Sequence, residues 1–224
     1  MYPEMSEIPF GRRPGKVIAV GLNYRQHAAE ADVNVLPWPV TFAKFPSCLI
    51  GPGEPITIPS GLVTVDYEAE LAVIIGKTAR NVSLDDALEY VAGYTCLNDV
   101  TDRDTQTREG QWSRSKSFDT FGPVGPTVVP ASEIPDPQAL VIRARLNGQV
   151  MQDASTSQMI HGVADLIAFL SRGMTLDAGD VIATGTPSGV GAFRDPPVYL
   201  RPGDQIEIEI EGIGVLSNPV VGSD

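Results

Sequence analysis

The chain has 224 residues, a formal net charge of −12 and a pI near 4.5. This acidic balance excludes binding to nucleic acid or to an anionic membrane surface, because both depend on clustered Lys and Arg. No run approaches the roughly 18 apolar residues of a membrane-spanning helix, and the N-terminus lacks the apolar core of a signal peptide. We therefore expect a soluble, cytoplasmic protein.

The rest of the composition favours a turn-rich β protein. Glycine (22 residues) and proline (19 residues) are plentiful, which argues against a helical bundle. The two cysteines, Cys48 and Cys96, make no disulfide framework, and with only two histidines they make no convincing zinc site. We expect one α+β domain, mainly β, over residues 16–224, preceded by an N-terminal extension at 1–15.

Apolar alternation and turn residues place the elements along the chain. Helices are predicted around 27–31, at 83–91, where Ser83 caps and Gly93 ends the helix, and at 155–171, where Ser155 and Gln158 fit a capping box. The stretch 101–125 is polar and is expected to be an irregular loop that lines a site. The strands are predicted at 16–21, 41–45, 56–58, 63–76, 95–100, 141–146, 181–184, 205–210 and 213–216, with a hairpin turn at Asn147-Gly148.

The stretch 63–76, VTVDYEAELAVIIG, is the most informative. Asp66, Glu68 and Glu70 alternate, so they share one face of a strand that runs into buried-looking sequence. Like charges in such a place are unfavourable unless a cation compensates them, and a divalent metal is the obvious candidate. The alternative is an edge strand with a solvated acidic face.

A metal site needs a further ligand, and the segment CLNDVTDRD offers Asp99, Asp102 and Asp104. Asp99 directly follows apolar strand-like residues, where its backbone is held firmly. A set of carboxylates without His or Cys selects a hard cation, such as Mg²⁺ or Mn²⁺.

Three other features could carry chemistry. His27 and Glu30 are spaced to share a helix face, so the carboxylate could orient the imidazole, although such pairs are often plain surface features. Lys116 could bind an anion or simply be solvated. The loop TGTPSGVG at 184–191 could bring backbone N–H groups to a small anion or be a tight turn, and it lacks the end of a P-loop.

Together these segments resemble the fumarylacetoacetate hydrolase family, and within it the short acylpyruvase and oxaloacetate decarboxylase group. The matching segments follow the family's order over nearly the whole chain from Lys16 onward. They are GLNYRQHAAE, FAKFPS, VDYEAELAVIIG, YVAGYTCLNDVTDRDTQ, KSFDTFGPVGP, LNGQVMQDASTSQMI, LIAFLS and GDVIATGTPSGVG.

The resemblance implies a β-sandwich roll with a few short helices, a homodimer and a bound Mg²⁺ or Mn²⁺. It implies that Asp66 is not a metal ligand. The residues that it assigns are Glu68, Glu70 and Asp99 as metal ligands, His27 and Glu30 as a catalytic dyad on a lid, Lys116 as a catalytic cation, and Arg103, Gln106 and Thr186 as substrate-binding residues.

The family's substrates are small 2-oxo acids, and the resemblance leaves three reactions open. We expect hydrolytic C–C cleavage of an acylpyruvate or fumarylpyruvate, with a water activated by His27. The alternatives are oxaloacetate decarboxylation and isomerisation of a 2-hydroxyhepta-2,4-diene-1,7-dioate. A non-catalytic scaffold is disfavoured by the intact dyad and lysine, and phosphoryl transfer by the missing phosphate clamp.

Overall fold

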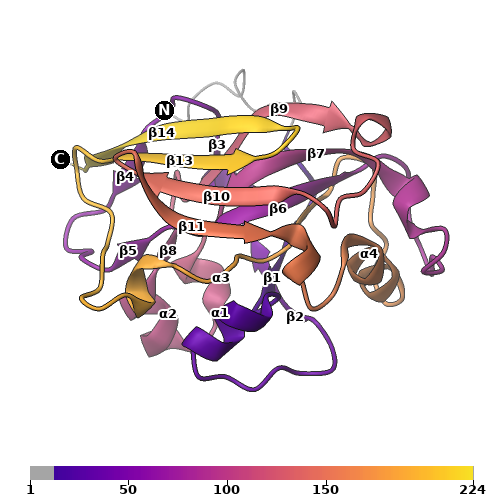
Figure 1. Cartoon of the computed structure of the whole chain (residues 1–224), viewed down its shortest axis with the longest axis horizontal. Coiled ribbons are helices and arrows are strands. Elements are labelled where there is room, and N and C mark those ends of the chain that lie inside the picture. Colours follow the sequence, from indigo (N-terminus) through magenta and orange to yellow (C-terminus); the bar gives the residue numbers. More distant parts are fainter. Residues whose placement is uncertain (1–12, 224) are drawn as a thin grey trace.

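Two large β-sheets packed face to face make up most of the fold (Figure 1). The computed structural model describes residues 13–223. The seven-stranded sheet has the order β2 (Val40–Lys44), β1 (Val17–Gly21), β12 (Val181–Ala183), β6 (Ala69–Ile75), β7 (Val91–Asn98), β9 (Gly122–Pro130) and β3 (Leu49–Ile50). The five-stranded sheet has the order β11 (Gln149–Ser155), β10 (Val141–Leu146), β13 (Gln205–Ile210), β14 (Gly214–Gly222) and β4 (Ile56–Ile58), and a small third sheet pairs β5 (Val65–Asp66) with β8 (Thr101–Asp102).

The prediction of a mainly β protein is confirmed, with 37% of residues in strands and 20% in helices. Alternation predicts β4, β10, β13 and the start of β14 in the five-stranded sheet, but not β11. The pattern is clear there because that sheet buries only one face. In β13, Ile206, Ile208 and Ile210 are buried, and the glutamates between them lie on the other face. The hairpin at Asn147-Gly148 is also confirmed, with both residues at positive φ between β10 and β11.

Strand β6 lies in the middle of the seven-stranded sheet and is buried along its whole length. Leu71, Val73 and Ile75 pack into the core between the sheets, whereas Ala72 and Ile74 pack into a second, smaller core on the other face. A strand that is covered on both faces requires the continuous apolar run that the sequence shows. The residues at its N-terminal end are therefore held in a rigid frame.

The helices are few and short. They are α1 (Arg25–Glu30), α2 (Arg103–Glu109), α3 (Trp112–Ser115) and α4 (Val163–Ser171), with 3₁₀ turns η1 (Pro46–Cys48), η2 (Ala87–Tyr90), η3 (Ala131–Glu133), η4 (Thr156–Gln158) and η5 (Gly191–Phe193). Figure 1 shows α1, α2 and α3 gathered at one end of the molecule, away from α4. No helix within 13–223 has both the length and the apolar character that crossing a membrane requires.

The predicted irregular loop at 101–125 is wrong in detail, because the segment contains β8, α2, α3 and the start of β9. Asp102 caps α2 by accepting a hydrogen bond from Thr105 N–H at 3.1 Å, and Gly110 ends it in the left-handed conformation. Helix α2 has no continuous apolar stripe, and this is why its polar sequence resembles a loop.

The helix predicted at 83–91 is also wrong, since only the 3₁₀ turn η2 forms there. Ser83 does accept a hydrogen bond from Asp86 N–H at 3.2 Å, as a cap would. Leu84 and Leu88 nevertheless remain exposed, so the segment has no apolar face to hold a longer helix against the core. Gly93, predicted to end this helix, lies within β7.

The helix predicted at 155–171 begins eight residues late, at Val163. Ser155 caps only the short turn η4. The interruption follows from Asn23, whose side chain accepts a hydrogen bond from the N–H of His161 and donates one to the carbonyl of His161. A side chain from far away in the sequence thus replaces the helical partners of His161.

Candidate active site

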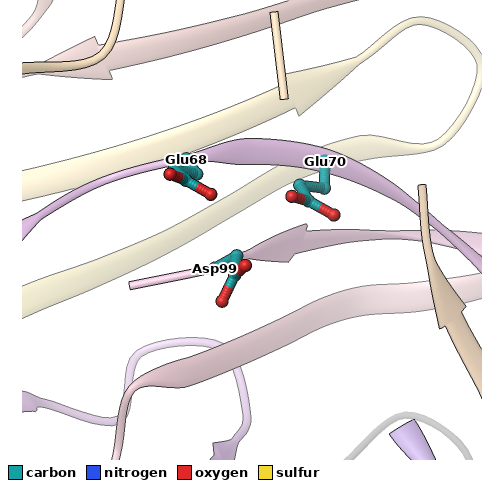
Figure 2. A group of neighbouring side chains, drawn as sticks. All are labelled: Glu68, Glu70 and Asp99. Carbon is teal, nitrogen blue, oxygen red and sulfur yellow. The ribbon is translucent and has the colours of Figure 1, made fainter. Parts of the chain in front are cut away.

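Three carboxylates meet where β6 begins and β7 ends (Figure 2). Glu68 directly precedes β6, Glu70 lies on it, and Asp99 follows β7. The side chain of Asn98 accepts a hydrogen bond from Glu68 N–H at 3.0 Å, and Asp99 N–H donates to the carbonyl of Glu68 at 2.9 Å. These bonds hold the two segments together, and one ligand atom from each carboxylate lies within 4.8 Å of the others. We call Glu68, Glu70 and Asp99 the carboxylate cluster.

Buried cations surround two members of this cluster. The ammonium of Lys116 lies 2.8 Å from Glu68 Oε2 and 2.8 Å from Asp99 Oδ2. Lys44 lies 2.7 Å from Asp99 Oδ1, and Arg103 lies 2.8 Å from Glu68 Oε1. Both oxygens of Asp99 and both oxygens of Glu68 therefore face a cation.

Glu70 differs from its neighbours. Its Oε2 accepts a hydrogen bond from Gly185 N–H at 2.9 Å, but within residues 13–223 it forms no ion pair. Burial and the nearby charges of Asp99 and Glu68 raise the pKa of Glu70 well above its ordinary value. Burial also disfavours the charge of Glu68, but Lys116 and Arg103 outweigh it and lower the pKa of Glu68 to about 2.

The donor set fits a divalent metal ion. All three members are buried carboxylates, and oxygen ligands of this kind suit Mg²⁺ or Mn²⁺. An additional cation would compensate the charge of Glu70, which the lysines and Arg103 leave unpaired. The alternative of a solvated acidic face does not hold, because Glu68, Glu70 and Asp99 are at most 5% exposed.

Asp66 lies apart from the cluster, although alternation predicts that it shares their face. The strand is interrupted after Asp66, because β5 ends there and β6 begins only at Ala69. Asp66 accepts hydrogen bonds from Arg103 Nε at 2.9 Å and from the N–H groups of Gly191 and Ala192 at 2.8 and 3.0 Å. It thereby connects Arg103 to η5.

His27 and Glu30 form the predicted pair on α1, with His27 Nδ1 2.8 Å from Glu30 Oε1. A carboxylate accepts hydrogen bonds, so Nδ1 carries the proton and Nε2 is the free nitrogen of the neutral ring. Gly189 N–H donates to Glu30 Oε2 at 3.0 Å and so holds the carboxylate in position. The ring of Phe193 flanks the imidazole, with centroids 6.0 Å apart.

The glycine loop at 184–191 contacts the protein's own carboxylates. Its N–H groups at Gly185, Gly189 and Gly191 donate to Glu70, Glu30 and Asp66, respectively. Those three groups are therefore not available to an external anion, contrary to one of the two sequence interpretations. The loop instead ties the carboxylate cluster to the His27 dyad.

One cavity of about 350 Å³ brings most of the predicted site residues together. The predicted site residues that line it are His27, Glu68, Glu70, Arg103, Gln106, Lys116 and Thr186. Glu30 and Asp99 lie behind this lining, in contact with His27 and Lys116, respectively. Apolar side chains, including Val33, Trp112 and Phe193, also line the cavity.

Sequence reasoning missed two buried polar residues beside the cavity. Lys44 ends β2, and its ammonium also donates to the carbonyls of Lys116 and Phe121. Gln152, on β11, contacts Thr186. No local pattern marks either residue, because their partners lie 34 to 83 positions away. The sequence also offered Asp102 and Asp104 as metal ligands. Asp102 instead caps α2, and Asp104 is exposed.

Comparisons with known proteins show which family the chain resembles in sequence and fold. Residues 16–221 match the family model of the fumarylacetoacetate hydrolase C-terminal domain. The mitochondrial oxaloacetate tautomerase of Rattus norvegicus is 48% identical over 210 residues, which is 93% of this chain and 67% of the relative. The chain thus spans about two thirds of the length of that relative.

Solved structures are similar over nearly the whole chain. The 5-carboxymethyl-2-hydroxymuconate delta-isomerase of Mycobacterium smegmatis superposes with a TM-score of 0.86 at 42% identity, covering 97% of this chain and 83% of that one. The fumarylacetoacetate hydrolase of Exiguobacterium antarcticum superposes with a TM-score of 0.88 at 46% identity, covering 95% and 77%. The chain belongs to the fumarylacetoacetate hydrolase family of enzymes.

Proposed function

We propose that the chain catalyses a metal-dependent proton transfer on a small 2-oxo acid, with keto–enol tautomerisation of oxaloacetate as the first candidate. The observation that carries the proposal is the shared cavity, which the His27 imidazole and the carboxylate cluster both line. Relatives named as oxaloacetate tautomerases and as isomerases, at 42–48% identity, favour proton transfer over the hydrolysis expected from the sequence.

Glu68, Glu70 and Asp99 would hold the metal ion, Mg²⁺ or Mn²⁺. When bound, the ion would supply positive charge next to the oxygens of a 2-oxo acid. Lys116, in contact with two of the three carboxylates, adds a fixed positive charge at the same place. Arg103, Gln106 and Thr186 line the cavity and would bind and orient the carboxylate of the substrate.

His27 is the proposed acid–base residue. Tautomerisation of oxaloacetate removes a proton at carbon 3, moves the double bond from C2=O to C2=C3 and adds a proton at the oxo oxygen, or the reverse, with no carbon–carbon σ bond broken. Nε2 of His27 is free to take or return the proton at carbon 3, since Nδ1–H is bound to Glu30. Glu30 stabilises the imidazolium that forms and keeps the ring oriented, and Gly189 holds Glu30.

Hydrolysis of an acylpyruvate is the second candidate, and the size of the cavity favours it. A cavity of about 350 Å³ that the apolar side chains of Val33, Trp112 and Phe193 help to line accommodates a substrate larger than oxaloacetate, such as one with an acyl chain. In that reaction His27 would activate a water for attack on the distal carbonyl. Oxaloacetate decarboxylation, a further alternative, needs no such water.

The test is an absorbance assay of the purified protein with Mg²⁺ on oxaloacetate, acetylpyruvate and fumarylpyruvate, each with an EDTA control. The proposal predicts EDTA-sensitive enol–keto conversion of oxaloacetate that is faster than loss of either diketo acid. Faster loss of a diketo acid would favour the hydrolase, and release of carbon dioxide from oxaloacetate would favour the decarboxylase. We also propose that residues 16–224 form a single domain and that the protein is a homodimer, which sedimentation velocity would test.

A further inference from the structure

Gln152 lies between β6, which carries the proposed metal ligand Glu70, and the glycine loop at 184–191. It is 1% exposed and comes from β11 of the five-stranded sheet. Its Oε1 accepts a hydrogen bond from Ala69 N–H at 2.9 Å. Its Nε2 donates to the carbonyl of Pro187 at 2.7 Å and to Thr186 Oγ1 at 2.8 Å. Three of the four hydrogen-bonding sites of this amide are therefore used, all in the interior.

The orientation of the Gln152 amide follows from its partners. The N–H of Ala69 can only donate, and the carbonyl of Pro187 can only accept. Exchanging the amide oxygen and nitrogen would leave both of these buried groups unpaired, at a substantial energetic cost. The group that faces Thr186 is thus the amide NH₂.

This orientation determines what the Thr186 hydroxyl does. Because Thr186 Oγ1 accepts from Gln152, its own proton points in another direction. Within residues 13–223, no carbonyl or carboxylate accepts that proton, although Thr186 is only 2% exposed and lines the cavity. The acceptor for the Thr186 O–H therefore has to come from a molecule in the cavity.

We propose that Gln152 is a positioning residue that makes the Thr186 hydroxyl a hydrogen-bond donor to a carboxylate bound in the cavity. Ala69 lies between the proposed ligands Glu68 and Glu70. The Gln152 amide therefore also links β6 to the Thr186 hydroxyl. Gln152 thereby fixes the position of the Thr186 hydroxyl relative to Glu68 and Glu70. The inference rests on the proposed function for the class of ligand, a 2-oxo acid.

Oxalate is the probe for this inference, because it carries the carboxylate without undergoing the reaction. Its affinity is measured by isothermal titration calorimetry with excess Mg²⁺. Thr186→Val keeps the shape of the side chain but removes the donor, and we expect about a tenfold weaker affinity, the usual scale for a hydrogen bond to a charged group. Thr186→Ser keeps the hydroxyl and should stay within about threefold of the parent.

The role of Gln152 is tested by repeating Thr186→Val in two further backgrounds. In Gln152→Glu, a carboxylate oxygen faces Thr186 and accepts its proton, so the hydroxyl no longer donates to the cavity. Thr186→Val should then weaken oxalate binding less than about threefold. In Gln152→Met the hydroxyl is free to rotate, and the effect should lie between the other two. If circular dichroism shows that Gln152→Glu does not fold, the effect of Thr186→Val is compared between the parent protein and Gln152→Met.

An equal effect of Thr186→Val in all backgrounds would overturn the role of Gln152, because a merely structural glutamine would not change what the threonine does. Absence of oxalate binding by the parent protein with Mg²⁺ would overturn it as well. The oxaloacetate assay is separate from this titration. A protein that fails that assay but shows the predicted order of oxalate affinities disproves the proposed function alone.

Discussion

The ammonium of Lys44 lies 2.7 Å from Oδ1 of Asp99, and both side chains are fully withdrawn from solvent. The same ammonium donates hydrogen bonds to the carbonyls of Lys116 and Phe121. Lys44 therefore holds a proposed metal ligand and, through the main chain, the proposed catalytic lysine. A buried charge with this many partners stabilises their arrangement more than it binds anything from outside.

Lys44→Met should destabilise the protein strongly, because it leaves the Asp99 carboxylate with one cation fewer and two carbonyls without a donor. We expect a loss of about 3–5 kcal/mol in the free energy of unfolding, measured by urea denaturation without added metal. Lys77→Met is the matched control, since Lys77 is exposed and forms a surface ion pair with Glu89 at 3.6 Å and a contact with the Tyr90 ring. Equal stability of the two variants would contradict the role of Lys44.

Metal binding should depend on Glu70, the member of the carboxylate cluster that forms no ion pair with any residue of 13–223. Mn²⁺ should raise the melting temperature of the parent protein, because it binds only the folded state. Glu70→Gln should weaken Mn²⁺ affinity by about tenfold or more in calorimetric titration. The control is Asp104→Asn, which changes an exposed carboxylate outside the cluster. If both variants bound Mn²⁺ like the parent, the assignment of the metal site would be wrong.

The two histidines should differ sharply in their effect on turnover. His27→Ala should reduce the Mg²⁺-dependent rate by about 10²-fold or more, the scale of a positioned acid–base group. His161→Ala should leave it nearly unchanged, because Asn23 holds only the backbone of His161. Initial rates at saturating substrate measure both effects. Comparable activity of the two variants would remove His27 from the mechanism.

The two cysteines should be inert in the folded protein. Both are buried and free; burial raises the pKa of Cys96 to about 12 and also raises the pKa of Cys48. Because the thiolate is the reactive form, neither should react with Ellman's reagent at pH 8 until the chain unfolds. Two equivalents should react in denaturant. Rapid reaction of the native protein would show that a thiol is accessible.

The strands and the site were predictable to different degrees, for physical reasons. Alternation of apolar residues reports burial on one face, so β13 and its neighbours could be located from local sequence. The resemblance brought Glu68, Glu70, Asp99, His27 and Glu30 together in advance. The structure places His27, Glu68 and Glu70 in the lining of one cavity, with Glu30 and Asp99 in contact with residues of that lining.

Contacts between distant segments account for the errors. Alternation places Asp66 with Glu68, but the strand is interrupted between them, and Arg103 binds Asp66. Asn23 interrupts the helical pattern at His161 from 138 positions away. Lys44 and Gln152 look like ordinary strand residues, and only the fold reveals that their polar groups meet partners in the interior.

The most direct test follows the enol–keto conversion of oxaloacetate by absorbance, with parent protein and with His27→Ala, each with Mg²⁺ and with EDTA. The account predicts a rate above the uncatalysed background for the parent protein with Mg²⁺. It also predicts that EDTA abolishes this rate and that the substitution lowers it by about 10²-fold. A parent rate equal to background, or one that neither EDTA nor His27→Ala reduces, would contradict the proposal of metal-dependent proton transfer through His27.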